Sequence, residues 1–225
     1  MSLKHVLVVM TNTAFIGPHK RPTGYFFPEI AHPWEVFEKA GIALEYVSPL
    51  GGAPHEDGYD EKDPVQRAFR ESKAIRRMSR SRKLSEVDVL DYDALFFPGG
   101  LGPMVDIAND PEVKRTVTRA WNAGMIVSAV CHGPVALLGA KLDDGTPLVR
   151  GRKLTSFTNA EEKGYAEADV PFHLQTALVD EGAKFEETAI WQPKVVVDGR
   201  LMTGQNPASA GPLAEAIVDA MRKGA

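Results

Sequence analysis

The sequence predicts an α/β fold in which helices cover a mostly parallel central sheet that has a small antiparallel edge. Short apolar runs recur along the chain with helical patterns between them, which is typical of parallel strands joined by helical crossovers. Near the carboxyl end, two such runs are joined by Asp198-Gly199-Arg200, a hairpin signal that predicts the antiparallel edge. Because no linker, repeat or low-complexity tract divides residues 1–225, we expect a single domain.

Each expected strand is a short apolar run, rich in Val, Ile, Leu or Phe and bounded by polar residues or glycine. In chain order the strands are Val6–Met10, Leu44–Val47, Ala94–Phe97, Ile126–Val130, Lys153–Phe157, Val195–Val197 and Leu201–Thr203. Each expected helix has apolar residues at helical spacing, and most begin at a proline. These helices are Pro33–Ala40, Pro64–Arg82, Pro111–Asn122, Pro134–Leu138, Pro171–Glu181 and Ser209–Arg222.

The composition excludes several classes of protein. With 44% hydrophobic residues and a net charge of −4, the chain reads as a globular protein without a general attraction to nucleic acid or anionic membranes. It has no secretory signal and no apolar run long enough to span a bilayer. A single cysteine cannot form an intramolecular disulfide, which favours a cytoplasmic location.

One segment departs from this acidic balance. Residues 62–84 contain nine Lys or Arg and two acidic residues, and an acidic stretch begins directly after them at Glu86. A basic helix can bind nucleic acid, but only Phe69 is available for base stacking. We therefore interpret the segment as a solvated helix face balanced by its neighbours, and expect no nucleic-acid partner.

Cys131 stands where a buried strand is expected to meet a helix. It follows Ile126–Val130 and precedes His132-Gly133-Pro134, and proline is well tolerated in the first turn of a helix. The positive end of a helix dipole favours thiolate over thiol, and His132 could take the proton. The pattern predicts a reactive, ionised nucleophile; the alternative is a buried structural cysteine.

Two further segments carry groups that suit such a nucleophile. Glu29 lies among apolar residues, where burial would raise its pKa and let it exchange a proton beside a thiolate; the alternative is an exposed acid at a helix start. Gly99 and Gly100 follow the strand Ala94–Phe97, where backbone N–H groups can bind a developing oxyanion. No dinucleotide, P-loop or zinc pattern is present, so neither a metal nor an organic cofactor is expected.

Five motifs in order resemble the ThiJ/PfpI superfamily, which has the class I glutamine-amidotransferase-like fold, a flavodoxin-like three-layer sandwich. They are the segment from Glu29 to Glu35, the segment from Leu84 to Gly100, Ala129–Pro134, Ser156–Glu162 and Val197–Ser209. Within the superfamily the chain is similar to the heat-shock-protein-31-like branch, which includes the cofactor-independent glyoxalase III enzymes. Glutamine amidotransferases carry a His-x-Glu pair, which this chain lacks.

The resemblance implies a role for each matching residue. Cys131 corresponds to the nucleophile, Glu29 to the carboxyl that contacts its sulfur, and His132 to the triad histidine. The triad acid lies in the stretch from Asn159 to Glu162, where Glu162 is preferred over Glu161. Gly100 and the backbone of His132, with Gly99 beside them, correspond to the oxyanion and substrate-binding groups.

The implied function is glutathione-independent conversion of methylglyoxal or a related 2-oxoaldehyde to a 2-hydroxy acid, D-lactate for methylglyoxal, through a hemithioacetal on Cys131. Two alternatives stay open at this point: a small cysteine peptidase or amidase of the same family, and a stress chaperone. The expected partner is a small aldehyde substrate. A homodimer is a candidate assembly, since dimers are common in the superfamily.

Overall fold

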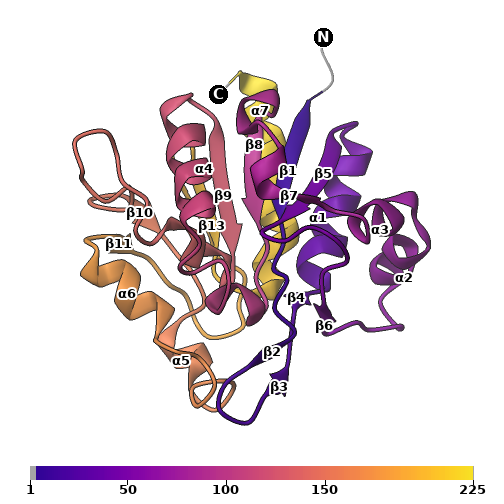
Figure 1. Cartoon of the computed structure of the whole chain (residues 1–225), viewed down its shortest axis with the longest axis horizontal. Helices are drawn as coiled ribbons and strands as arrows, with labels where there is room; N and C mark the ends of the chain where they lie inside the picture. The colour runs from indigo at the N-terminus through magenta and orange to yellow at the C-terminus, as the bar shows by residue number, and fades with distance from the viewer. Residues whose placement is uncertain (1–3, 225) are drawn as a thin grey trace.

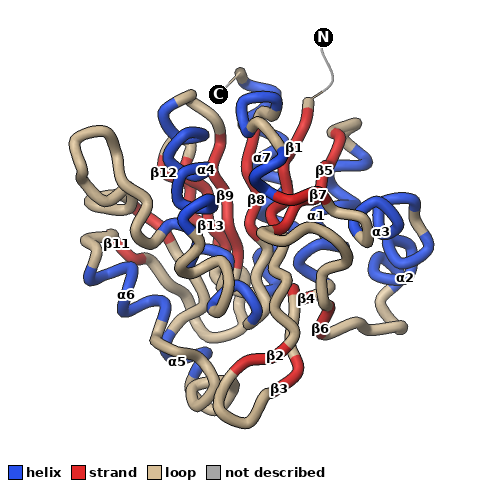
Figure 2. The backbone as a smooth tube through the Cα atoms, in the orientation of Figure 1, coloured by secondary structure: helices blue, strands red, loops and turns tan. Residues whose placement is uncertain are grey.

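The computed structural model describes residues 4–224 and places seven strands in one twisted sheet (Figures 1 and 2). From edge to edge the strands are β12 (Val195–Asp198), β13 (Leu201–Gly204), β9 (Ile126–Val130), β8 (Ala94–Phe97), β1 (His5–Val9), β5 (Ala43–Ser48) and β7 (Arg82–Lys83). All neighbours pair in parallel except β12 and β13, which form the antiparallel hairpin. The predicted fold class is therefore confirmed.

Helices cover both faces of this sheet. On one face lie α1 (Pro28–Lys39), α7 (Ala210–Lys223), α2 (Pro64–Glu71) and α3 (Lys73–Met78), and on the other lies α4 (Pro111–Asn122). Alternate residues of β1 enter the two cores, Val6 and Val8 on the α1 side and Leu7 and Val9 on the α4 side. Burial of both faces explains why the central strands are continuous apolar runs.

Shorter elements complete the fold, and β2, β3 and α5 lie beyond the carboxyl ends of the central strands (Figure 1). The shorter elements comprise three two-stranded ladders, two short helices and five turns of 3₁₀-helix. The ladders pair β2 (Phe15–Ile16) with β3 (Arg21–Pro22), β4 (Tyr25–Phe26) with β6 (Glu56–Asp57), and β10 (Lys153–Leu154) with β11 (Lys184–Phe185). The helices are α5 (Asn159–Glu162) and α6 (Leu174–Asp180), and the 3₁₀ turns are Leu84–Glu86, Val89–Asp91, Gly102–Met104, Gly133–Leu137 and Pro207–Ser209.

The predicted helix Pro64–Arg82 is wrong as a single element. It divides at Ser72, whose backbone is extended and whose hydroxyl accepts hydrogen bonds from Ala74 N and Ile75 N. A serine that caps the next helix in this way cannot continue the previous one. The helical segment ends at Met78, and Arg82 instead begins the edge strand β7.

Other boundaries also differ from the prediction. The helix expected from Pro33 begins at Pro28, with Pro33 inside it, and the one expected from Pro171 begins at Leu174. Of the strand Lys153–Phe157 only Lys153–Leu154 is extended, and it pairs outside the main sheet. No helix among the described residues is long and apolar enough to cross a bilayer.

Candidate active site

Cys131 terminates the fully buried strand β9 with a backbone φ of +60°. A positive φ is unfavourable for a residue with a Cβ and persists only where the surrounding structure imposes it, a condition met mainly at functional sites. Here Cys131 N donates to Gly204 O and Cys131 O accepts from Phe157 N, so that neighbouring segments hold the residue from two sides. The chain turns sharply at Cys131, as it does at the nucleophile of enzymes in which that residue lies between a strand and a helix.

The segment after Cys131 is not the α-helix expected from Pro134 to Leu138. It is a 3₁₀ turn over Gly133–Leu137, and Gly133 lies so close to the end of β8 that a Cβ there would stand 2.1 Å from Phe97 O. This contact explains the glycine. A turn this short has little macrodipole, so the proposed cause of thiol ionisation is absent.

Burial of Cys131, which is 4% exposed, and the carboxyl of Glu29 raise the pKa of the thiol well above its usual value. Hydrogen bonds from the backbone N–H groups of Gly100 and His132 lower the pKa of the thiol, but by less than burial and Glu29 raise it. The direction of this shift is opposite to the ionised thiolate that the sequence predicts, and it favours a thiol over a thiolate at Cys131.

His132 and Glu162 form a buried relay beside the sulfur. His132 Nδ1 lies 3.3 Å from Cys131 Sγ, and its Nε2 lies 2.7 Å from Glu162 Oε2. The His132 and Glu162 side chains are 1% and 3% exposed. The sequence order Cys-His places the two side chains together locally, whereas Glu162 comes from helix α5 across the site. A histidine held this way can accept the thiol proton while the carboxylate stabilises the resulting imidazolium.

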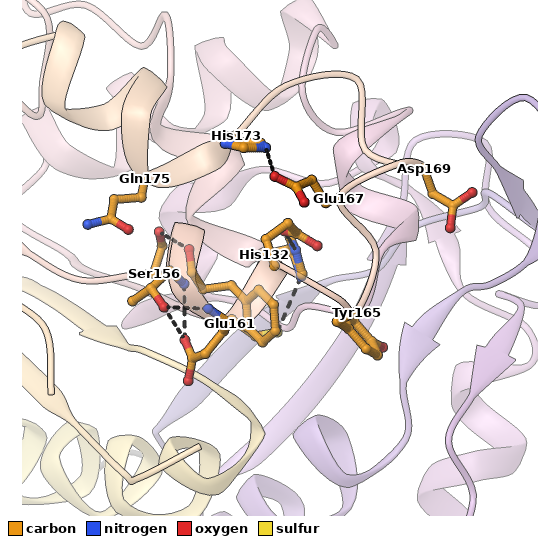
Figure 3. Close-up of polar contacts among 12 residues, drawn as sticks. His132, Ser156, Glu161, Tyr165, Glu167, Asp169, His173 and Gln175 are labelled. Carbon is orange, nitrogen blue, oxygen red and sulfur yellow. Dashed lines mark hydrogen bonds and ion pairs between the residues drawn. The ribbon is translucent and has the colours of Figure 1, made fainter. Parts of the chain in front are cut away.

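Glu161, the neighbour of Glu162, makes structural hydrogen bonds instead of facing His132, and Figure 3 draws part of this network. Its Oε2 accepts from Thr158 N and Thr158 Oγ1, which caps α5, and its Oε1 accepts from Trp191 N, Gln205 Nε2 and Asn206 Nδ2. The three bonds to Oε1 connect α5 to two distant loops. One function of the Gln205-Asn206 motif is thus to hold Glu161.

Glu29 is fully buried in the first turn of α1, where its Oε2 accepts a 2.6 Å hydrogen bond from Gly99 N. Its Oε1 has no nitrogen or oxygen partner within the part of the chain that the structure describes, and the carboxyl forms a hydrogen bond with the Cys131 thiol. Burial raises the pKa of Glu29 to about 8, a shift that the thiol and Gly99 only partly offset. The expected buried acid is present, and it can gain or lose a proton near neutral pH.

The two glycines after β8 have different positions. Gly99 donates its N–H to Glu29, so this amide is not free for an oxyanion as the sequence had suggested. A Cβ on Gly99 would stand 2.7 Å from Glu29 Oε2, Cys131 Cβ and His132 N. Gly100, at φ +90°, turns its N–H to the Cys131 sulfur. Glycine at both positions lets two backbone segments approach the reactive groups closely.

A small cavity of about 80 Å³ opens above these groups. It is lined by Phe26, Glu29, Gly100, Cys131, His132, Phe157, Tyr165, Trp191 and Pro207. Pockets for drug-sized ligands measure roughly 300–1,000 Å³, so this cavity admits a molecule of only a few heavy atoms. Among the described residues no cluster of His, Cys, Asp or Glu has the geometry of a metal site.

The aromatic walls of this cavity were not predicted from the sequence. Trp191 sits at φ +61° with its N–H bound to Glu161, and its ring packs edge-on against Phe157 and Tyr165. Tyr165 is also held by Arg21, which donates to its carbonyl oxygen and lies over its ring. Neither residue belongs to a local motif, so only the folded chain brings them to Cys131.

The buried acid Glu29 predicts how stability depends on pH. Because its pKa is about 8 in the fold and 4.5 ordinarily, the folded protein keeps a proton that the unfolded chain releases between these values. The free energy of unfolding should therefore fall as pH rises through this window. Urea unfolding at pH 5, 6.5 and 8 should show this slope in the wild type and a shallower one in Glu29→Gln. If the free energy of unfolding changed with pH equally in the two proteins, the raised pKa of Glu29 would be contradicted.

Comparison with known proteins places the chain among relatives of similar length. It is 32% identical to Glyoxalase 3 of Candida albicans, with 96% of this chain and 97% of that protein covered, and 29% identical to the glutathione-independent glyoxalase HSP31 of Saccharomyces cerevisiae, with 99% and 100% covered. The crystal structure of glyoxalase III from C. albicans superposes with a TM-score of 0.83 at 29% identity, covering 96% of this chain and 97% of that one. Residues 27–220 match the DJ-1/PfpI family, and the chain belongs to this family.

Proposed function

We propose that this protein converts methylglyoxal, or a closely related 2-oxoaldehyde, to the 2-hydroxy acid without glutathione. The observation that carries the proposal is the pair formed by the Cys131 thiol and the protonatable Glu29 carboxyl inside a cavity of about 80 Å³. A nucleophile and a proton carrier at one small site are what the isomerisation of a 2-oxoaldehyde requires. Relatives named glutathione-independent glyoxalases support the same activity.

The first step forms a bond between Cys131 Sγ and the aldehyde carbon. The thiol proton passes to His132 Nδ1, which faces the sulfur at 3.3 Å, while Glu162 stabilises the imidazolium. The aldehyde oxygen takes up a proton to give a hemithioacetal. The N–H groups of Gly100 and His132, which act on the sulfur in the resting site, are placed to stabilise negative charge on that oxygen.

The second step moves hydrogen between the two substrate carbons. Glu29, as carboxylate, removes the proton from the carbon bonded to sulfur and leaves an enediol, and the proton is then delivered to the neighbouring carbon. The first carbon is oxidised to a thioester while the second is reduced to an alcohol, so no external oxidant or reductant is needed. Water hydrolyses the thioester, releasing the 2-hydroxy acid and the thiol. With the stereochemistry of the family, methylglyoxal gives D-lactate.

A small-substrate panel tests the proposal. Methylglyoxal, glyoxal, a chromogenic peptide and a simple amide are incubated with wild type and Cys131→Ala in glutathione-free buffer that contains EDTA. We expect lactate from methylglyoxal with wild type and none above background with Cys131→Ala, because the covalent intermediate cannot form. Hydrolysis of the peptide or amide without lactate formation would replace the proposal by the hydrolase alternative. Protection of client proteins by both forms, without turnover, would favour the chaperone.

The cavity argues against a peptidase, since a peptide chain needs far more room than about 80 Å³. A cytoplasmic location and a homodimeric assembly stay predictions; a small aldehyde is the partner that the site and the relatives support. Gel filtration with light scattering measures the assembly directly.

A further inference from the structure

A cavity of about 770 Å³ lies away from Cys131, His132 and Glu29 and is lined in part by the basic segment. Its walls come from β5, from α3 and from the turn that follows α3, and Figure 1 shows these elements together at one edge of the sheet. His5, Ala43 and Leu44 place it at the amino-terminal ends of β1 and β5. Cys131 lies at the carboxyl end of β9. Because β9, β1 and β5 run parallel, the groove and Cys131 lie at opposite ends of the strands. We call this cavity the β5–α3 groove.

Five cationic side chains converge on the β5–α3 groove: Lys73, Arg76, Arg77, Arg80 and Arg82. The acidic residue in its lining is Glu45, which pairs with Arg82 at 3.3 Å. Lys73, Arg77 and Arg80 form no ion pair with any described residue. Like charges held in one concave site repel one another and raise the local positive potential, and a bound anion relieves that repulsion.

The wall of the groove also contains an unused buried donor. Tyr46 is 3% exposed and belongs to the lining of the groove, and its buried hydroxyl has no hydrogen-bond partner among residues 4–224. Leaving a buried hydroxyl unpaired is costly, so the group is normally satisfied by a neighbour or a ligand. The charged groups that act on it are Arg77, which favours negative charge there, and Glu38 of α1, which opposes it.

The exposed edge of β5 adds backbone donors to the same site. The neighbouring strand β7 pairs only with Val47 and Ser48, so no described strand pairs with residues 43–46 on that side. Parallel strands alternate the direction of their N–H groups, so half of the amides in this stretch point away from β1 and toward the groove. Guanidinium, phenol and amide donors in one groove suit an anion with several oxygens.

We propose that the β5–α3 groove binds a small polyanion through its phosphate or carboxylate oxygens. Arg77 and Arg80 contact the anionic groups, and the Tyr46 hydroxyl donates to one of their oxygens. The volume falls within the roughly 300–1,000 Å³ of sites for small molecules and is far larger than a single phosphate needs. A compact ligand with two or more anionic groups therefore fits better than a single inorganic ion.

Isothermal titration at 150 mM salt, with pyrophosphate and citrate as separate probes, tests this site on the full chain. We expect wild type to bind at least one probe, and pyrophosphate alone or citrate alone would identify the anionic group. The double variant Arg77→Gln/Arg80→Gln should weaken binding by roughly tenfold or more, because it removes two charge-assisted contacts. Arg222→Gln, an exposed arginine in the last turn of α7, is the matched control and should bind as wild type.

Tyr46→Phe separates ligand binding from folding. The ring stays in the core while the unpaired hydroxyl is removed, so the melting temperature without ligand should equal or exceed that of wild type. Affinity for the probe should nevertheless fall by roughly three- to tenfold. Unchanged affinity in Tyr46→Phe and in the double variant, or an equal loss in Arg222→Gln, would overturn the site. So would the absence of binding by both probes, or a single-stranded oligonucleotide binding far tighter than either.

Discussion

Glu29→Gln should lower lactate formation from methylglyoxal by roughly 10²–10⁴-fold, the usual contribution of a general acid–base group. The amide keeps the shape of the side chain and an oxygen for Gly99 N, which now lies 2.6 Å from the carboxyl. It cannot take a proton from the substrate carbon. Addition of the aldehyde to Cys131 should persist, so the variant should form the hemithioacetal and then turn over slowly.

The dependence of the rate on pH distinguishes a catalytic role of Glu29 from a purely structural one, because a structural role would leave that dependence unchanged. Since burial raises the pKa of Glu29 to about 8, the wild-type rate should rise with pH and level off near that value. The residual rate of Glu29→Gln should lack this inflection. The variant should also be at least as stable as wild type at pH 8, because it buries no carboxylate. A full rate in the variant, or an unchanged profile, would remove Glu29 from the mechanism and weaken the glyoxalase proposal.

Glu162→Gln and Glu161→Gln should separate catalysis from structure at adjacent positions. Glu162 faces His132 Nε2 at 2.7 Å, and an amide there cannot stabilise the imidazolium by charge. We expect kcat to fall by up to about 10⁴-fold, the loss found when the acid of a Ser-His-Asp triad is replaced by its amide. The melting temperature should change by only a few degrees, because the neutral amide can still hydrogen-bond to the histidine.

Glu161→Gln should have its main effect on stability. Its two oxygens accept five hydrogen bonds from Thr158, Trp191, Gln205 and Asn206, and an amide would aim N–H groups at N–H groups. Two or more buried donors left unpaired cost roughly 3–5 kcal/mol, which lowers the melting temperature by about 10 °C in a chain of this size. Calorimetry and steady-state kinetics on both variants check the pair. A stable, inactive Glu161→Gln beside an active Glu162→Gln would reverse the assignment.

The sequence determined the fold class because a parallel sheet buries both faces of its strands. Runs such as Ile126–Val130 and Ala94–Phe97 are apolar throughout, and they form the neighbouring strands β9 and β8. It also predicted that Cys131 and His132 act together, and the structure brings Cys131 Sγ within 3.3 Å of His132 Nδ1 because the two residues are adjacent. Gly99 and Gly100 could be assigned to the site for the same reason, because two adjacent glycines shortly after a strand form a local sequence pattern.

Two predicted helices failed for different reasons. The segment after Cys131 became a 3₁₀ turn because it must pass against Phe97, a contact with a distant segment. The basic segment broke at Ser72 because that side chain caps the next helix, a local signal that the helical pattern did not take into account. The state of the thiol was also misjudged. Position in a strand-to-helix corner suggested ionisation, whereas burial and the Glu29 carboxyl raise the pKa of Cys131.

Composition and motif order by themselves determined that this chain is an α/β protein, and they placed its single cysteine at the end of a strand. The tertiary structure alone decided which acid faces His132, since Glu161 and Glu162 are neighbours and differ only in the direction their side chains take from α5. It likewise decided the aromatic walls given by Tyr165 and Trp191, and it placed Tyr46 and the cationic residues of α3 in the lining of one groove. These features depend on contacts between segments far apart in the chain, and such contacts leave no periodicity or spacing for a sequence pattern to record.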